Sequence, residues 1–367
     1  MVKEVAFVVP GDLATPTGGY AYDRRIIAEL RTAGWNVQVL DIGEGFPRPT
    51  AAARAAAHRR LAELPGERAV VIDGLAFGVL TAEAQALAPA CRLVALVHHP
   101  LALETGLSAS ESAELRESER AALACARHVI ATSPSTAHLL VADYAVAPER
   151  LSVVRPGTDR IVAQPRLPGP VLDLLAVGSV VPRKGYDILV AALAEIPDLA
   201  WRLVIAGDRE RSPQTARALD AQIARLGLAG RITFAGAVAP QRLMQLYAAA
   251  DLFVLPSRFE GYGMAYAEAI AHGVPVVGTQ AGAIPQTVPA GAGVLVPPDD
   301  VDAFATVLRR LIASPPEREA LAAGARAAAA TFPSWQDSGG LFARVLEQVG
   351  PHPNPPPQAG EGKGGGP

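Results

Sequence analysis

The chain has 367 residues, of which 50% are hydrophobic and 19% are charged, and its formal net charge is -3. This length suffices for about two domains, and the charge offers no basic footprint of the kind that binds nucleic acid. Two cysteines without metal-ligand spacing, Cys91 and Cys125, favour a reduced, cytoplasmic protein. No apolar run is long enough to span a bilayer, and the start, MVKEVAFVVPGD, indicates a first strand rather than a signal peptide.

Short β-branched runs alternate along the chain with longer Ala- and Leu-rich segments of helical spacing. In the first half the runs are EVAFVVP, NVQVLDI, AVVIDG, RLVALVH, HVIATS and LSVVRPG. In the second half they are LDLLAVGS, WRLVIAGD, ITFAGAV, LFVLPS, VPVVGT and AGVLVPP. This alternation predicts an α/β fold of two Rossmann-like, doubly wound parallel-sheet domains that face each other across a cleft. Ligands of such sheets gather at the carboxyl ends of the strands.

A segment rich in proline and glycine, RPGTDRIVAQPRLPGP at 155–170, separates the two halves. We therefore expect an N-terminal domain over 1–160, a linker over 161–170 and a second domain over 171–333. Further helices are predicted over 316–331 and over 334–349, and the second of these is expected to pack back on the N-terminal domain. The end of the chain, 350–367, is rich in proline and glycine and is predicted to be disordered.

Gly18 and Gly19 stand between the first predicted strand and an amphipathic helix. The loop contains no G-x-G-x-x-G pattern, so a dinucleotide fingerprint is not supported. Two glycines at a helix start let a ligand approach the backbone closely, although a plain turn has the same appearance. The Ala-rich segment 51–64 carries arginines but no bulky apolar anchors, which favours a solvated surface helix over a membrane-surface helix.

A predicted strand ends at His98 and His99, and Glu104 and Thr105 follow in the same loop. Adjacent histidines in a turn do not readily chelate one ion, and no third ligand stands nearby in the sequence. We therefore expect no metal site here, and a structural role for either histidine is the simpler interpretation. Glu104 and Thr105 are weak candidates for contact with a second substrate.

Arg183 and Lys184 stand at the end of a predicted strand and the start of a helix, in VGSVVPRKGYD. An arginine fork and a lysine point charge together suit a diphosphate. The position at a helix start strengthens this interpretation over that of a solvated basic turn.

The stretch RFEGYGMAYAEAIAHGVPVV places Glu260 in a loop before a helix and Glu268 within that helix. The glycines between them expose backbone N–H groups beside the positive end of the helix, which favours an anionic or hydroxyl-rich ligand. His272 falls in the last turn, where a cation suits the helix dipole. In the alternative interpretation Glu260 caps the helix and Glu268 is solvated, but the apolar neighbours of Glu268 argue for a specific partner.

These stretches resemble the retaining GT-B glycosyltransferases of glycosyltransferase family 4. The resemblance rests on E-x(7)-E followed by a small-residue helix and G-x-P-V-V, and on RKG at 183–185. It implies that Glu260 faces the hydroxyls of the donor sugar, that Glu268 binds the ribose and that Lys184 binds the diphosphate. It also implies that His98 approaches the donor sugar. The donor-binding residues that it implies, beyond those named, are Gly18, Gly19, Val238, Tyr262, Gly263, Met264 and Ala265, with the backbone of Ala237 and Val238 near the nucleobase.

Two positions depart from the family pattern. Ser179 stands where the family often carries an arginine, and we infer that Arg183 takes over part of its load. Gln286 stands where the family more often has an acidic residue, at the edge of the site.

The resemblance implies transfer of a sugar from a nucleotide-diphospho-sugar to an unidentified acceptor, which is a saccharide, a lipid-linked molecule or a small molecule. It implies retention of anomeric configuration, with no metal and no further cofactor. In catalysis Arg183, Lys184 and Glu260 would serve the leaving diphosphate and the sugar, together with His98. A sugar-nucleotide 2-epimerase on the same fold remains an alternative. A non-catalytic sugar-nucleotide-binding subunit is another, since Ser179 and Gln286 depart from the pattern.

Overall fold

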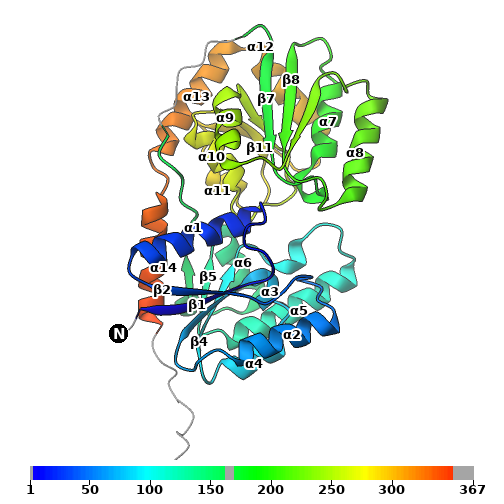
Figure 1. Ribbon diagram of the computed structural model, residues 1–367. Coiled ribbons are helices and arrows are strands. Elements are labelled where there is room, and N and C mark those ends of the chain that lie inside the picture. The colour runs from blue at the N-terminus through cyan, green and yellow to red at the C-terminus, as the bar shows by residue number, and fades with distance from the viewer. Residues whose placement is uncertain (1–2, 162–168, 350–367) are drawn as a thin grey trace, which may run out of the picture.

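The computed structural model describes residues 3–161 and 169–349 and folds them into two α/β halves, one below the other in Figure 1. The expectations for the linker residues 162–168 and for the tail 350–367 fall outside the described residues. Each half contains one parallel sheet of six strands with helices on both faces. The predicted fold class is confirmed, and every predicted strand is present.

The first sheet has the strand order β2-β1-β3-β4-β5-β6. Its strands are β1 (Glu4–Val9), β2 (Asn36–Asp41), β3 (Ala69–Asp73), β4 (Arg92–Val97), β5 (His128–Ala131) and β6 (Leu151–Val153). Its helices are α1 (Gly18–Thr32), α2 (Ala51–Ala62), α3 (Gly74–Phe77), α4 (Thr81–Leu87), α5 (Ala109–Cys125) and α6 (Pro134–Tyr144). Strands β3 and β4 are buried at every residue, as expected for central strands that helices cover on both faces.

The second sheet has the strand order β12-β11-β10-β7-β8-β9. Its strands are β7 (Leu172–Val177), β8 (Trp201–Ala206), β9 (Ile232–Gly236), β10 (Leu252–Val254), β11 (Val276–Thr279) and β12 (Gly293–Val296). Its helices are α7 (Tyr186–Ala194), α8 (Pro213–Arg225), α9 (Pro240–Ala249), α10 (Met264–Ala271), α11 (Ile284–Thr287), α12 (Val301–Ala313) and α13 (Pro315–Ala329). One apolar core joins this sheet to its helices.

Each sheet has one point where the chain reverses its direction of winding. In the first sheet this point lies between β1 and β3, and in the second it lies between β7 and β10. Loops leave the carboxyl ends of such strands on opposite sides of the sheet, which opens a crevice where ligands bind. The carboxyl edges of the two sheets meet, because Gly261, after β10, lies against the carbonyl oxygen of His98, after β4. The fold therefore brings the two crevices together.

The last described helix, α14 (Trp335–Gln348), lies against α1 of the first half (Figure 1). Its apolar face, which includes Phe342 and Leu346, joins Phe7 and Ile26 in the core on one side of the first sheet. The two segments that pass between the halves run side by side, since the Thr158 N–H donates to the Pro333 carbonyl at 2.9 Å.

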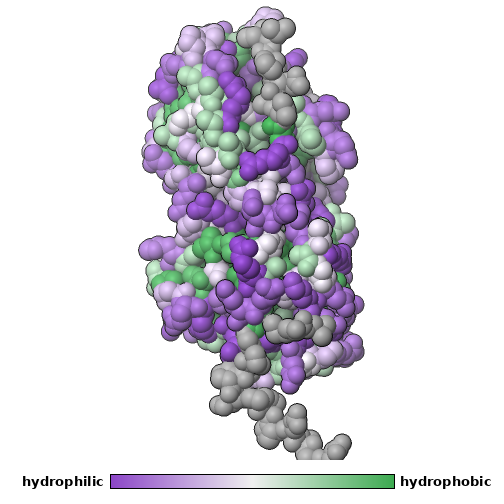
Figure 2. All heavy atoms as spheres, turned by 90° about the vertical axis from the view of Figure 1, so that its left-hand side faces the viewer, coloured by the Kyte–Doolittle hydropathy of each residue, from purple (hydrophilic) through white to green (hydrophobic). Residues whose placement is uncertain are grey.

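The outer surface carries few large apolar side chains. Only Val39, Val141, Val171 and Met244 are both large and exposed among residues 3–161 and 169–349. On the face shown in Figure 2, apolar residues are mixed with hydrophilic ones. Within the described part of the chain, no helix has the length and apolar character that crossing a membrane requires. Helix α2 buries only Ala57 and Leu61, which agrees with a solvated surface helix.

The contact between α1 and α14 gives a test of this packing. A Cβ atom on Gly339 would collide with the side chain of Glu29 on α1, whereas one on Gly340 would meet only Arg344 Nη1, at 3.7 Å. Gly339→Ala should therefore lower the free energy of unfolding by about 1–3 kcal/mol. Gly340→Ala, the matched control, should be neutral or stabilise by up to about 1 kcal/mol through helix propensity. Urea unfolding of both variants measures the difference, and equal stabilities would show that the two helices do not pack as described.

Candidate functional site

Glu260 lies in the loop after β10 and is the centre of a buried ion-pair cluster. Its side chain is only 8% exposed. Its Oε1 accepts hydrogen bonds from Lys184 Nζ and Ser257 Oγ, both at 2.7 Å, and its Oε2 accepts one from Arg183 Nη1 at 3.1 Å. The carboxylate expected to face the sugar is thus bonded to both cations expected to hold the diphosphate.

The charges in this cluster stabilise one another. Burial alone would raise the pKa of Glu260, but Lys184 and Arg183 more than offset it and lower this pKa to about 2. Burial would likewise lower the pKa of Arg183, and Glu260 and Glu104 raise it. Glu260 and Arg183 are therefore both charged at neutral pH. Burial lowers the pKa of Lys184, and the Glu260 carboxylate opposes that shift.

The loops after β7 and β10 hold these side chains in place through close backbone contacts. Gly185, with φ +67°, follows the 3₁₀ turn Pro182–Lys184, and a side chain there would collide with the Pro256 carbonyl. The Arg258 N–H donates to the Arg183 carbonyl at 2.8 Å, and Arg183 Nη1 donates to the Phe259 carbonyl at 2.7 Å. Both loops are therefore fixed to each other at the winding reversal of the second sheet.

Helices α7 and α10 both start beside this cluster without a side-chain cap. Gly185 and Gly263 occupy the cap positions in left-handed conformations. Neither residue has a side chain that could bond the first-turn N–H groups. The Ile188 and Tyr266 N–H groups donate to the Gly185 and Gly263 carbonyls, and the N–H groups before them in each helix could serve a ligand. Gly261 also allows a close contact between the halves, because the side on which a Cβ would lie is filled by the His98 carbonyl. Its own carbonyl accepts a hydrogen bond from Thr136 Oγ1 at 3.3 Å.

Glu268 is hydrogen-bonded rather than solvated, since its Oε2 accepts from the Tyr247 hydroxyl at 2.9 Å. Burial raises the pKa of Glu268 to about 7, although the Tyr247 hydrogen bond opposes this shift. The interpretation of Glu260 as a helix cap is excluded as well, since the cap residue of α10 is Gly263.

The expectation that His272 is a helix-end cation is wrong. The His272 ring stacks on Tyr247 with centroids 5.0 Å apart, and its Nδ1 lies 2.8 Å from the Glu268 carbonyl. Burial lowers the pKa of His272, so the ring is neutral at neutral pH. The position of His272 at the end of a helix could not predict its contact with Tyr247, which comes from another helix.

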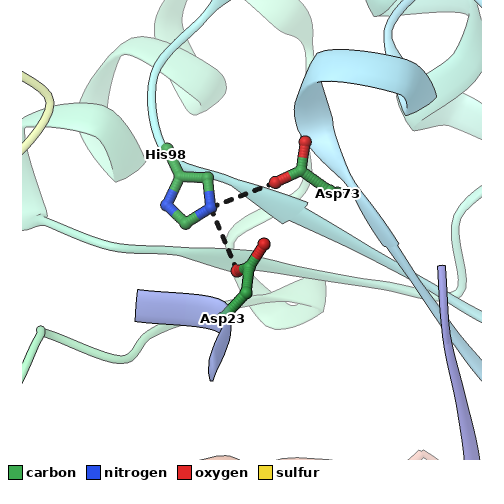
Figure 3. A group of neighbouring side chains, drawn as sticks. All are labelled: Asp23, Asp73 and His98. Carbon is green, nitrogen blue, oxygen red and sulfur yellow. Dashed lines mark ion pairs between the residues drawn. The ribbon is translucent and has the colours of Figure 1, made fainter. Parts of the chain in front are cut away.

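Sequence reasoning missed two carboxylates beside His98. Its Nε2 lies 3.3 Å from Asp23 Oδ1 and 3.2 Å from Asp73 Oδ2, as Figure 3 shows. Asp23 comes from α1 and Asp73 from the end of β3, so only the fold brings them together. A signal was present, because AVVID ends a buried strand in a carboxylate and Asp23 falls on a helix face with apolar residues. The donor atoms of these side chains lie within 4.8 Å of one another, and this is the candidate metal-binding group among the described residues. The expectation of no metal stays a prediction.

Polar side chains also connect the two halves near the cluster. Glu104 Oε1 lies 3.3 Å from Arg183 Nε, and Glu104 Oε2 lies 3.4 Å from His99 Nε2. Burial would raise the pKa of Glu104, but His99 and Arg183 lower it to about 2. Gln286 Oε1 accepts the Ser135 N–H at 3.0 Å, so this departure from the family pattern forms a contact between the halves.

The remaining predicted residues lie at three places. Gly18 and Gly19 open α1, where Gly18 approaches Met264 of the second half and Gly19 lies against the His98 ring. Tyr262 accepts a hydrogen bond from Thr287 Oγ1 through its carbonyl, at 2.5 Å. Val238 lies after β9 at the edge of the second core. These positions leave the assignment of a nucleobase site near Val238 as a prediction.

Comparison with known sequences gives a consistent result for both halves. Residues 18–160 match the family described as Glycosyltransferase Family 4, and residues 172–314 match Glycosyl transferases group 1. The chain is 32% identical over 323 residues to the MMP alpha-(1->4)-mannosyltransferase of Mycolicibacterium hassiacum, covering 83% of this chain and 76% of that protein. It is 35% identical over 241 residues to D-inositol 3-phosphate glycosyltransferase 1 of Catenulispora acidiphila, covering 60% of this chain and 57% of that protein. The match thus spans less than two thirds of the second relative's length.

Solved structures agree in fold. Sucrose-phosphate synthase from Thermosynechococcus elongatus superposes with a TM-score of 0.81 at 22% identity, covering 95% of this chain and 99% of that chain. Anabaena Alr3699/HepE in complex with UDP and glucose superposes with a TM-score of 0.75 at 21% identity, covering 94% and 99%. At such identities the likeness is one of fold. With the sequence matches to both halves, it follows that the chain belongs to glycosyltransferase family 4 (glycosyl transferases group 1) and is a glycosyltransferase of the GT-B fold.

Proposed function

We propose that this glycosyltransferase moves a sugar from a nucleotide-diphospho-sugar to a hydroxyl group of an acceptor, with retention of anomeric configuration and without a metal ion. The observation that carries the proposal is the pair of cations, Arg183 and Lys184, at the winding reversal of the second sheet, where their side chains are only 16% and 13% exposed. They lie beside the start of α7, which has no side-chain cap. The loop that carries their partner Glu260 leads into the start of α10, which has none either.

These groups suit the leaving diphosphate. Arg183 offers a planar fork and Lys184 a point charge, and the helix starts add N–H groups and positive dipole ends. Negative charge develops on the phosphate oxygens as the bond to the sugar breaks, and fixed donors stabilise that charge at no reorganisation cost. When the diphosphate shares the cations, one oxygen of Glu260 is released to accept hydrogen bonds from the sugar hydroxyls.

The ribose is assigned to Glu268, whose carboxylate oxygens suit a pair of hydroxyl groups. Tyr247 fixes the orientation of this carboxylate through the hydrogen bond at 2.9 Å. Retention of configuration, and transfer of the acceptor proton to the leaving phosphate, rest on the family resemblance.

The acceptor meets the sugar on the side of the first half, near His98 and Glu104. The names of two relatives, a mannosyltransferase and a D-inositol 3-phosphate glycosyltransferase, favour a sugar or polyol acceptor. Cys91 and Cys125 are both free thiols, which supports the proposed cytoplasmic location.

A donor panel tests the proposal directly. Thermal unfolding is measured with UDP-, GDP- and ADP-sugars, with and without EDTA. A donor at about one hundred times its Kd stabilises the fold by about 2.7 kcal/mol. The donor that stabilises the protein is then incubated with a panel of sugars and polyols, and the anomeric proton coupling of the product reports the configuration. No stabilisation by any donor, a product of inverted configuration, or loss of activity with EDTA would each contradict the corresponding part of the proposal.

Glu260→Gln should be strongly destabilising in the free protein. The change leaves Lys184 without its carboxylate partner and leaves Arg183 only the half-exposed Glu104, and breaking a buried pair in this way costs about 3–5 kcal/mol. A nucleoside diphosphate should restore more stability to the variant than it adds to the wild type, because its phosphates replace the missing charge. Chemical unfolding with and without the nucleoside diphosphate measures both effects.

The control for this change is Glu104→Gln, which also removes a partner of Arg183. Glu104 is 45% exposed, so solvent screens its pair and the expected cost is about 0–1 kcal/mol. The pH dependence gives a second check. Since the folded pKa of Glu260 is about 2, its contribution to wild-type stability is present above about pH 4.5 and is lost as the pH falls toward 2. Equal costs for the two variants, or an unchanged acid dependence in Glu260→Gln, would show that Glu260 does not hold the cations.

Donor affinity should increase as the pH rises from 6 to 8. The pKa of Glu268 is about 7 in the free protein, and the ionised carboxylate is the better acceptor for ribose hydroxyls. If only the ionised form binds, the fraction of competent protein rises roughly tenfold over this interval. Calorimetry with a sugar nucleotide suits the measurement, since its phosphates do not titrate in this range.

Glu268→Gln removes the titrating group, so affinity in that variant should be low and independent of pH. Tyr247→Phe removes a hydrogen bond that favours the ionised carboxylate, so the midpoint should move to higher pH. A wild-type affinity that does not change between pH 6 and 8 would argue against Glu268 as the ribose acceptor.

A further inference from the structure

The environment of His98 contains more buried negative charge than a structural histidine needs. Asp23 is 0% exposed and Asp73 is 2% exposed, and both face the same ring nitrogen, Nε2. Among residues 3–161 and 169–349 no donor makes a hydrogen bond to the Asp23 carboxylate, whose charge is met by the ion pair with His98 Nε2. Asp73 has one additional partner, because its Oδ1 accepts the Leu75 N–H at 2.8 Å. A buried carboxylate with so few partners is unfavourable unless a cation neutralises it.

The groups around the ring leave His98 itself as that cation. Asp23 comes from α1 and Asp73 from β3, and these are the charged side chains that pair with the ring. The hydroxyls of Tyr20 and Tyr22, also on α1, donate to the Pro10 and Val154 carbonyls, and the Tyr22 ring meets the imidazole edge-on with centroids 5.3 Å apart. The second half approaches through the backbone of Gly261. A proton on His98 is therefore the simplest compensation for the two carboxylates.

We propose that Asp23 and Asp73 are positioning residues that hold His98 as an imidazolium, so that its second N–H donates a hydrogen bond to a substrate oxygen and the ring does not act as a base. The proposal rests on the sugar-transfer function proposed above. Figure 3 shows Nε2 directed at the two carboxylates and the other ring nitrogen, Nδ1, directed away from them. The His98 side chain is 20% exposed, so one side of the ring remains accessible.

The position of the ring fits this role. The His98 carbonyl lies against Gly261, one residue after Glu260, and the ring lies against Gly19 at the start of α1. His98 therefore stands where the two crevices meet, between the residues assigned to the donor sugar and the first half. A neutral imidazole with its proton on Nε2 would present a bare Nδ1, which accepts hydrogen bonds. The imidazolium presents an N–H instead and keeps both of its protons throughout the transfer.

The electrostatics support the geometry. Burial would lower the pKa of His98, but Asp23 and Asp73 raise it to about 10. Burial also raises the pKa of Asp23, to about 7, while His98 opposes that shift. Histidine protonation is thus favoured over carboxylate protonation at neutral pH.

The protonation state of His98 can be observed without any substrate. The protein has seven histidines, and a His98→Gln spectrum identifies the His98 signals in nitrogen-15-labelled protein. In the wild type both ring nitrogens should remain protonated from pH 6 to 8.5. In Asp23→Asn, and in Asp73→Asn, the ring should titrate at lower pH. Asparagine is isosteric with aspartate and also caps helix starts, so the α3 cap formed by Asp73 is kept. The exposed Asp143, on α6 of the same half, gives the control variant Asp143→Asn, which should leave the signals unchanged.

The pH dependence of turnover separates this role from a merely structural role of Asp23 and Asp73. Because His98 stays protonated between pH 6 and 8.5 in the wild type, its titration should cause no change in kcat over this range. In Asp23→Asn, kcat should fall roughly tenfold as the pH rises through the lowered pKa of His98. The neutral ring no longer donates the charged hydrogen bond to the substrate oxygen. Affinity for the bare nucleoside diphosphate should not change, since that ligand is assigned to the second half.

Three results would overturn the proposal. These are a wild-type His98 that titrates between pH 6 and 7.5, a single neutral tautomer at pH 7, or one equivalent of metal bound to purified protein and lost in Asp23→Asn. The last result would assign the three side chains to a metal ion. If wild-type protein does not bind a nucleoside diphosphate, the proposed sugar transfer is contradicted instead. Failure of the His98 proposal and failure of the proposed function are therefore distinguishable.

Discussion

Two largely covered cations share one buried carboxylate, and the second half of the molecule is arranged around that contact. Arg183 and Lys184 reach Glu260 because the loops after β7 and β10 are bonded to each other through their backbones. The glycine at 185 is required there, since any side chain would collide with the Pro256 carbonyl. The same contact extends to the first half, because Arg183 also pairs with Glu104. An anion that competes for Arg183 therefore acts on the loops after β7 and β10 and on the junction of the halves at once.

The two crevices present different polar groups. The second sheet presents two cations and two helix starts without side-chain caps, which suits a ligand that carries its own negative charge. On the first sheet Asp23 and Asp73 are buried and face the His98 ring. Gly261 and His98 mark the line where these surfaces meet. In the function proposed above, a sugar bound at this line would have its phosphate beside the second sheet and its reacting carbon near His98.

Local sequence predicted those features that depend on local physics. The strands followed from β-branched runs, and Arg183, Lys184, Glu260 and Glu268 followed from polar residues at strand ends and helix starts. Asp23 and Asp73 could not be found in this way, because their partner is more than twenty residues from either in sequence and only the sheet order places them together. The error at His272 has the same origin. Its place at a helix end favoured a cation, while burial of the ring, which stacks on Tyr247 of another helix, lowers its pKa and keeps it neutral.

The position of α14 has a consequence for how the protein is made. The first half is completed by the last described helix, whose Trp335, Phe342 and Leu346 fill one side of the first core. After residues 1–160 have been synthesised, the ribosome must still add the whole second half before α14 emerges. At typical synthesis rates that takes on the order of 10–35 s. During this interval Phe7, Ile26 and Leu30 lack their cover, so the nascent chain presents an apolar surface that chaperones or other nascent chains can bind. The first half is therefore synthesised first, but its core is completed only after the second half has been made.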